Sequence, residues 1–196
     1  MEPGRHRTLR LRRFPMTESD TSSAASRLCS KCGMCCNGVM FHTVRLLPGD
    51  SAKELSALGL KLKRKKGRNC IQQPCPAFRG SHCSIYAARP ERCRLFECRQ
   101  LKRVAAGEIT ETMAMERIGE AQRRVREVNE LLEQAGGTNV KRPLSKRCEK
   151  VMAEPASDRA GMELQSRLTA SMRELDALLD REFRIHPIAA DGEPIV

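Results

Sequence analysis

The feature that most constrains this chain is the spacing of its cysteines. Four of the ten cysteines fall in one octapeptide, CSKCGMCC, as Cys29, Cys32, Cys35 and Cys36. Thiolates are the preferred ligands of zinc and of iron–sulfur clusters, and a C-x-x-C step lets one turn bring two sulfurs to one metal centre. The octapeptide therefore predicts a metal site. Five more cysteines follow within the next 62 positions, so several segments must converge on the sulfur: Cys70, Cys75, Cys83, Cys93 and Cys98.

A secreted disulfide scaffold is the other class of protein with cysteine this dense. The first fifteen residues carry five arginines and no apolar stretch of the roughly 7–15 residues that a signal peptide needs. The adjacent pair Cys35 and Cys36 and the two C-x-x-C steps would also crowd a disulfide pattern. We therefore favour metal binding and expect a cytoplasmic location, where thiols stay reduced. No apolar run approaches the roughly 20 residues needed to cross a bilayer, so we expect no membrane partner.

Aromatic residues are scarce, at 3% of the chain with no Trp and one Tyr. Large core side chains are therefore few, and metal–sulfur bonds can replace part of the core, because structural metal sites contribute on the order of 10 kcal/mol to folding. The prediction is a small irregular α+β metal-stabilised cysteine domain followed by an α-helical hairpin.

Changes in composition divide the chain into four predicted segments. These are a disordered Arg- and Ser-rich N-terminus at 1–26, a cysteine-cluster metal-binding domain at 27–102, a helical hairpin at 105–185 and a flexible tail at 186–196. Met16 is an alternative start of the chain. Within the second segment, turn residues separate short apolar pieces, of which the piece at 39–47 has the composition of a strand.

The helical segment follows from apolar periodicity. Apolar residues recur at steps of three and four over 109–135 and again over 157–183, with a shorter helix expected at 143–154. Gly136 and Gly137 end the first long helix, and Ser157 or Asp158 can cap the second. Two such stripes pack most simply on each other as an antiparallel hairpin. The hairpin could also dock an unknown protein partner.

The formal net charge is +12, and the stretch KLKRKKGR at 61–68 holds six basic residues. A basic run of this kind can bind the phosphates of a nucleic acid. It can also be a solvated loop whose charge offsets a negative metal–thiolate centre. Almost no aromatic residues are available to stack on bases, and no recognised reading motif is present. We therefore favour the solvated loop and keep nucleic acid as the weaker candidate partner.

Three segments form an ordered pattern: CSKCGMCCNG at 29–38, PCPAF at 74–78 and CSIYAARPERCRLFEC at 83–98. The pattern resembles the YkgJ-type CxxCxxCC cysteine-cluster family, described as a zinc- or iron-chelating domain, over roughly residues 27–102. The resemblance leaves Cys70 and Cys148 as extras and implies that eight cysteines are the metal ligands: Cys29, Cys32, Cys35, Cys36, Cys75, Cys83, Cys93 and Cys98.

The residues beside these cysteines suit a metal site. Gly33 and Gly38 permit a positive φ and close backbone approach to sulfur. Arg89 and neighbouring arginines can offset the charge of the centre. Tyr86 and Phe96 are expected to cover the site and exclude water.

The choice between zinc and an iron–sulfur cluster depends on spacing. The steps Cys29-x₂-Cys32-x₂-Cys35 match the opening of a bacterial ferredoxin run, and Cys75-Pro76 supplies its later Cys-Pro. This favours a 4Fe–4S cluster, while a closed zinc site with four cysteines stays open as an alternative. Neighbouring side chains diverge from a shared backbone, so Cys35 and Cys36 should serve different centres. As a hypothesis, one centre takes Cys29, Cys32, Cys35 and Cys75, and the other takes Cys36, Cys83, Cys93 and Cys98.

The sequence supports two functions from different classes. The favoured one is a metal-chelating protein in a structural, carrier or sensor role. The alternative is an iron–sulfur-dependent enzyme for methyl transfer or redox chemistry, because a flagellin lysine methylase carries a similar cysteine motif. The chain contains no Gly-rich phosphate loop, H-E-x-x-H pair or G-x-S-x-G elbow, so enzyme activity has no positive evidence.

Overall fold

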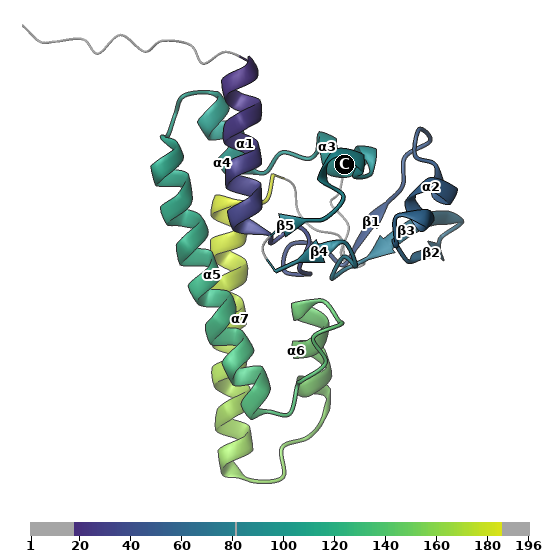
Figure 1. Cartoon of the computed structure of the whole chain (residues 1–196). Coiled ribbons are helices and arrows are strands. Elements are labelled where there is room, and N and C mark those ends of the chain that lie inside the picture. The colour runs from purple at the N-terminus through teal and green to yellow at the C-terminus, as the bar shows by residue number, and fades with distance from the viewer. Residues whose placement is uncertain (1–17, 81, 186–196) are drawn as a thin grey trace, which may run out of the picture.

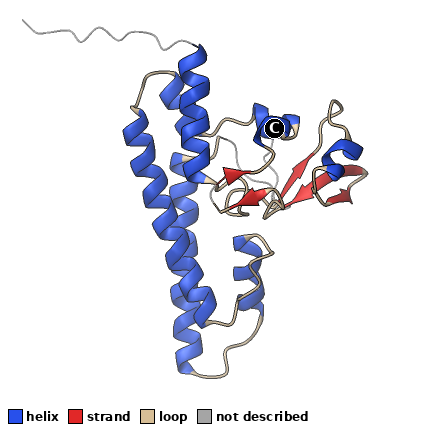
Figure 2. Ribbon diagram, in the orientation of Figure 1, coloured by secondary structure: helices blue, strands red, loops and turns tan. Residues whose placement is uncertain are grey.

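The structure is a computed structural model that describes residues 18–80 and 82–185. The predictions for residues 1–17 and for the tail at 186–196 lie outside the described residues. The chain mixes small antiparallel sheets with long helices (Figures 1 and 2), and the sheets and the long helices occupy opposite sides of the molecule.

The cysteine-rich part of the chain contains short elements joined by turns. Helix α1 (Glu18–Cys32) is followed by β1 (Thr43–Arg45), α2 (Ala52–Ala57), β2 (Leu62–Lys65) and β3 (Arg68–Gln72). A second group comprises β4 (Phe78–Arg79), β5 (His82–Cys83), the 3-10 turn η1 (Tyr86–Ala88), α3 (Glu91–Leu95) and α4 (Arg99–Ala105).

Two antiparallel sheets organise these elements. The larger sheet has the strand order β1-β3-β2, and the smaller one pairs β4 with β5. One face of the larger sheet carries Val44, Ile71 and Leu62, which lie side by side on the three strands. This face packs against Leu55 on α2 and against Leu60, which follows α2. The sheet therefore has its own small apolar core, separate from that of the helices.

The helical part consists of α5 (Glu111–Gln134), α6 (Leu144–Ala153) and α7 (Arg159–Glu182). Helices α5 and α7 lie side by side in opposite directions, and α6 in their connection packs against both (Figure 1). Thr110 and Asp158 cap α5 and α7 through side-chain oxygens that accept backbone N–H bonds. The two long helices predicted from periodicity and the shorter helix expected at 143–154 all agree with the observed ends to within two residues.

Helix α1 differs from the predicted disorder of residues 1–26, because its described residues 18–26 are helical. Ser and Thr have low helix propensity, but Ala24 and Leu28 are almost fully buried in the core formed with α4, α5 and α7. Packing on the bundle outweighs local propensity here. The strand expected over 39–47 is also shorter, since β1 covers only Thr43–Arg45.

The cysteine-rich part and the helices are held together by polar contacts as well as by this core. Gln122 on α5 donates from its side chain to the carbonyl of Lys31, with a donor–acceptor distance of 2.7 Å. Buried Gln100 on α4 donates to the carbonyl of Glu182 at 2.7 Å. The Nε2 atom of His42 lies 2.6 Å from the Oγ atom of Ser145 on α6. The end of α1 and the start of α4 are thereby fixed relative to the long helices, and the segment before β1 is fixed to the start of α6.

Truncation of an interface leucine should measure how much the helical core stabilises the chain. Leu175 on α7 is fully buried, so Leu175→Ala should lower the free energy of unfolding by about 2–5 kcal/mol through lost burial and a residual cavity. Met162 on the same helix is 58% exposed, and Met162→Ala should change the free energy of unfolding by less than about 0.5 kcal/mol. Denaturant titration of the two variants checks this, and equal midpoints would contradict the packing described.

Candidate metal centre

The eight cysteines of the motif segments gather at the junction between the helices and the larger sheet, and they separate into two groups. Electrostatic interactions connect Cys35 with Cys32, Cys98 and Cys29. They also connect Cys29 directly with Cys98. We call these four the first thiol set: Cys29, Cys32, Cys35 and Cys98.

The remaining four cysteines form the second thiol set: Cys36, Cys75, Cys83 and Cys93. The thiol of Cys36 interacts with each of the other three. Cys93 in turn interacts with Cys75 and Cys83. The interactions between the two sets involve Cys36, which raises the pKa of Cys35 and has its own pKa raised by Cys29. The two sets therefore adjoin.

Side-chain packing gives the same division independently. The first thiol set packs against the core of the helical bundle. Cys75, Cys83 and Cys93 pack against the core of the larger sheet. Seven of the eight cysteines are thus divided between the two apolar cores in the same way, and the peptide bond between Cys35 and Cys36 is where the chain passes from one set to the other.

The end of α1 positions the first thiol set. Cys29 and Cys32 occupy its last turn, and Gly33 ends the helix with φ +66° while its N–H donates to the carbonyl of Cys29. A Cβ at Gly33 would lie 2.5 Å from the Cζ atom of Phe78, so the ring covers the glycine directly. The predicted positive φ is confirmed at this position, while the close approach seen here is to the Phe78 ring and not to a sulfur.

Cys98 reaches the first thiol set from the start of α4, where it is the N-cap residue. The backbone amides of Leu101 and Gln100 favour its thiolate and partly offset the effect of burial. Gln100 is itself held by the C-terminal end of α7. The position of Cys98 therefore depends on the helical bundle as well as on the cysteine segment.

The second thiol set is positioned by loops and short strands. The N–H of Cys75 donates to the carbonyl of Cys36 at 2.8 Å, which joins two segments 39 positions apart. Cys83 pairs with Phe78 in the β4–β5 ladder. Cys93 lies on α3, whose first N–H, from Glu91, donates to the Oδ1 atom of Asp50 at 2.8 Å.

Asp50 is a positioning residue that the motif analysis missed. Its second oxygen, Oδ2, accepts the N–H of Leu47 at 2.8 Å, so this one carboxylate joins the turn after β1 to the start of α3. The Pro48-Gly49-Asp50 turn was the available sequence signal, because Asp in a turn commonly accepts backbone N–H bonds.

The hypothetical assignment of the sequence analysis is wrong in one exchange. Cys75 lies with the second thiol set and Cys98 with the first, the reverse of the hypothetical assignment. The expectation that Cys35 and Cys36 belong to different groups agrees with this arrangement. The N–H of Cys75 is hydrogen-bonded to the carbonyl of Cys36, and Cys98 is brought to the first set by the position of α4. Neither contact can be predicted from the spacing of the cysteines in the sequence.

Burial is the main influence on the thiols. It raises the pKa of Cys29 from 9.0 to about 11, and neighbouring Cys98 adds to the rise. It raises the pKa of Cys32 and of Cys93 to about 12. The pKa values of Cys35 and Cys36 also lie far above the ordinary range, through burial first and repulsion from the surrounding thiols second. In the absence of a cation all five are therefore neutral thiols at physiological pH.

Arg89 provides positive charge between the two sets. Its guanidinium carbon lies 3.8 Å from the centroid of the Tyr86 ring. It lowers the pKa of Cys29 in the first set and of Cys93 in the second. The charge compensation predicted for the arginines near Cys93 is therefore seen at Arg89. Phe96, the other aromatic expected at the site, packs edge-on against Phe41 with ring centroids 5.0 Å apart.

The donor set fits zinc or an iron–sulfur cluster in chemistry, because each thiol set supplies the four sulfur ligands that either group requires. Among residues 18–80 and 82–185, no three His, Cys, Asp or Glu side chains are placed so that they could already hold an ion. The thiols of a set lie near enough to interact electrostatically. Binding would therefore require them to turn toward a common centre.

Cys70 and Cys148 lie outside both sets. Cys70 is buried in β3 and its thiol donates to the carbonyl of Lys63 at 3.2 Å. Cys148 is buried on α6 against the helical core, which raises its pKa to about 11. Their position agrees with the expectation that these two cysteines are extras.

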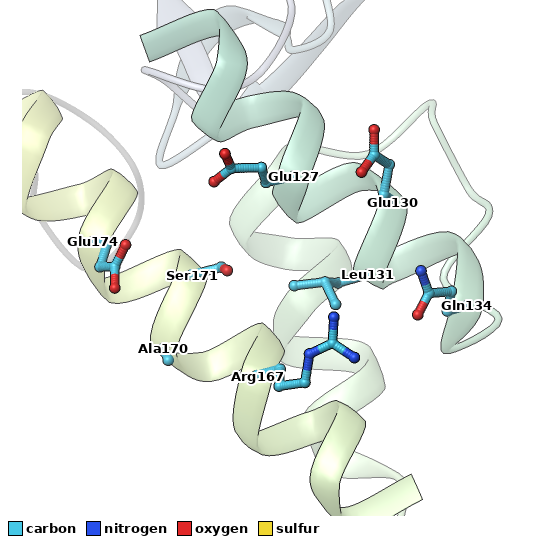
Figure 3. Close-up of a pocket in the computed structure, with 8 residues that line it drawn as sticks. All are labelled: Glu127, Glu130, Leu131, Gln134, Arg167, Ala170, Ser171 and Glu174. Carbon is cyan, nitrogen blue, oxygen red and sulfur yellow. The ribbon is translucent and has the colours of Figure 1, made fainter. Parts of the chain in front are cut away.

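A groove of about 340 Å³ lies between α5 and α7 (Figure 3). Glu127 and Glu130 project from α5, and Arg167 and Glu174 from α7. None of the eight predicted ligands lines it. The groove is thus separate from the cysteine site.

Comparison with known proteins gives one match. Residues 28–118 match the model of the CxxCxxCC family, described as a "putative zinc- or iron-chelating domain". The resemblance predicted from the motif segments is thereby confirmed, and the match extends beyond Cys98 through α4 into the first turns of α5. No curated protein and no solved structure gives a significant match. Within the described residues, every helix is too short or too polar to span a membrane.

Gly33 offers a sharp test of the site's backbone geometry. Gly33→Ala should distort the end of α1, because the new Cβ would collide with Phe78 and because a positive φ costs a non-glycine residue about 1–2 kcal/mol. Gly119 is the matched control, since it lies within α5 with no heavy atom within 4 Å of an added Cβ. Gly119→Ala should stabilise the chain by about 0.5–1 kcal/mol. Thermal unfolding should separate the two variants in opposite directions, and a harmless Gly33→Ala would contradict the described turn.

The raised thiol pKa values predict how metal binding depends on pH. The thiols of Cys29, Cys32 and Cys93 are protonated at pH 7, whereas zinc binds thiolates, so binding must release protons. Rising pH weakens the competition from protons, and zinc affinity should therefore increase by at least about tenfold per pH unit between pH 6 and 8. A pH indicator in weakly buffered solution should report acid on addition of Zn²⁺ and none on addition of Mg²⁺. Zinc binding without proton release would show that other ligands are used.

Proposed function

We propose that this protein is a metal-chelating protein that holds two metal centres, one on each thiol set. The observation that supports the proposal best is that electrostatic interaction and apolar packing divide seven of the eight cysteines in the same way, with Cys36 placed by its interactions alone. Four thiols per set is the number that a closed zinc site or a 4Fe–4S cluster requires.

The order of the ligands favours an iron–sulfur cluster at the first thiol set. In two-cluster bacterial ferredoxins the C-x₂-C-x₂-C run supplies three ligands to one cluster, and the cysteine before proline goes to the other cluster. Here Cys29, Cys32 and Cys35 share one set, and Cys75, which precedes Pro76, lies with the other. The exchange of Cys75 and Cys98 therefore brings the arrangement closer to the ferredoxin pattern.

A structural role, or an electron- or metal-handling role without catalysis, agrees best with this arrangement. If all eight thiols are ligands, both centres are closed, whereas a catalytic metal keeps one position open for water or substrate. The second thiol set joins the two sheets and α3, and the first joins α1 to α4. Metal bonds at these junctions would contribute directly to folding.

Cysteine replacement tests both the function and the division into sets. Protein purified without oxygen should contain two centres, measured as iron, sulfide and zinc per chain together with its visible absorption. Cys32→Ser should remove the centre of the first set, and Cys93→Ser that of the second, each leaving about half of the bound metal. Cys148→Ser, outside both sets, should retain all of it.

Several outcomes distinguish the parts of this proposal. Wild-type protein without metal would overturn the function itself. Loss of the same centre in Cys32→Ser and Cys93→Ser would leave a chelating protein but refute the two separate sets. If either variant is insoluble, a metal titration of the other, which retains one complete set, decides the stoichiometry.

A further inference from the structure

The distribution of charge along the chain is uneven. Residues 27–102 contain 16 basic and four acidic residues, so the whole formal net charge of +12 resides in the cysteine domain, and the remainder of the chain is neutral. Two centres with four thiolates each would add a charge of only about −4. In the solvated-loop interpretation, the charge of residues 61–68 only offsets that of the metal sites. The positive charge of the domain is larger than this compensation needs.

The excess is concentrated on the β2–β3 hairpin. No acidic residue occurs between Glu54 and Glu91. Lys61, Lys63 and Arg68 are exposed on or beside the two strands. The register places Lys63 and Arg68 on the same face of the sheet, because Lys63 pairs with Cys70 and Lys65 with Arg68. This face is opposite to the one that packs on α2, so the charges point away from the apolar core.

The β2–β3 hairpin is also accessible to a large ligand. β1 pairs with β3 only from Cys70 to Gln72, so the turn between Lys65 and Arg68 projects beyond β1 as a two-stranded ribbon. Lys66 and Gly67, with φ 49° and 76°, form its tip. The hairpin lies on the side of the molecule opposite to α5 and α7 (Figures 1 and 2). Neither the long helices nor the candidate metal ligands obstruct it.

We propose that the β2–β3 hairpin binds the phosphate backbone of double-stranded DNA without reading its sequence. A two-stranded ribbon fits the major groove of a duplex, and its flanking cations can neutralise phosphates on both sides of the groove. The scarcity of aromatic residues removes the stacking that single-stranded binding uses. Lysines on an edge strand also discourage sheet pairing, but this role does not call for Arg68 on the central strand.

The test uses the full-length, metal-loaded protein and a short mixed-sequence duplex, with binding followed by fluorescence anisotropy. The hairpin variant carries Lys61→Gln, Lys63→Gln and Arg68→Gln. A control variant removes the same charge from exposed residues of the helical region, as Arg123→Gln, Arg126→Gln and Lys141→Gln. The hairpin variant should bind at least about tenfold more weakly, and the slope of log affinity against log salt between about 50 and 200 mM should fall by about 2–3. The control should change affinity by less than about threefold.

The controls decide what each result means. If the hairpin variant has the same metal content as the wild type, its weaker DNA binding arises at the hairpin and not from loss of the metal centres. Equal losses in the two variants would overturn the hairpin as the binding element. Absence of duplex binding by the wild type, or tighter binding of polyglutamate than of the duplex, would overturn DNA as the partner.

Discussion

The structure depends on how a chain buries many thiols in a small volume. Burial and mutual repulsion raise the pKa values of Cys29, Cys32 and Cys93 by about two to three units, which keeps these groups neutral and the charge inside the domain low. A cation at the same place reverses this balance, because it favours the thiolate that burial disfavours. A metal ion that binds these thiols must therefore displace their protons.

The adjacent pair Cys35 and Cys36 determines the topology around the sulfur. Consecutive side chains leave the backbone in different directions, and here Cys35 packs against the helical core while Cys36 interacts with Cys75, Cys83 and Cys93. These three partners of Cys36 pack on the core of the larger sheet. Thiols of the two adjoining cores therefore meet at this peptide bond, with Arg89 supplying positive charge to both sets.

Sequence reasoning predicted the parts of the fold that depend on local periodicity and missed those that depend on packing. The steps of three and four located α5 and α7, because a helix that buries one face repeats that pattern in sequence. The N-terminal half of α1 was missed, since its Ser and Thr residues form a helix only where Ala24 and Leu28 meet the bundle. The same limit explains the exchange of Cys75 and Cys98: their neighbours are fixed by one backbone hydrogen bond and by the placement of α4, and spacing encodes neither.

The two thiol sets differ in how far apart their members lie along the chain, and this has a consequence for assembly. Three members of the first set fall within seven consecutive residues at the end of one helix, so gathering them costs little loop-closure entropy. The fourth member, Cys98, lies 63 positions after Cys35, so completing the first set closes one long loop that contains both sheets. The second set closes three shorter loops, of which the longest runs 39 positions from Cys36 to Cys75. Every cysteine of the second set lies inside the loop that Cys98 closes, so completing the first set also brings together the two ends of the segment that carries the second.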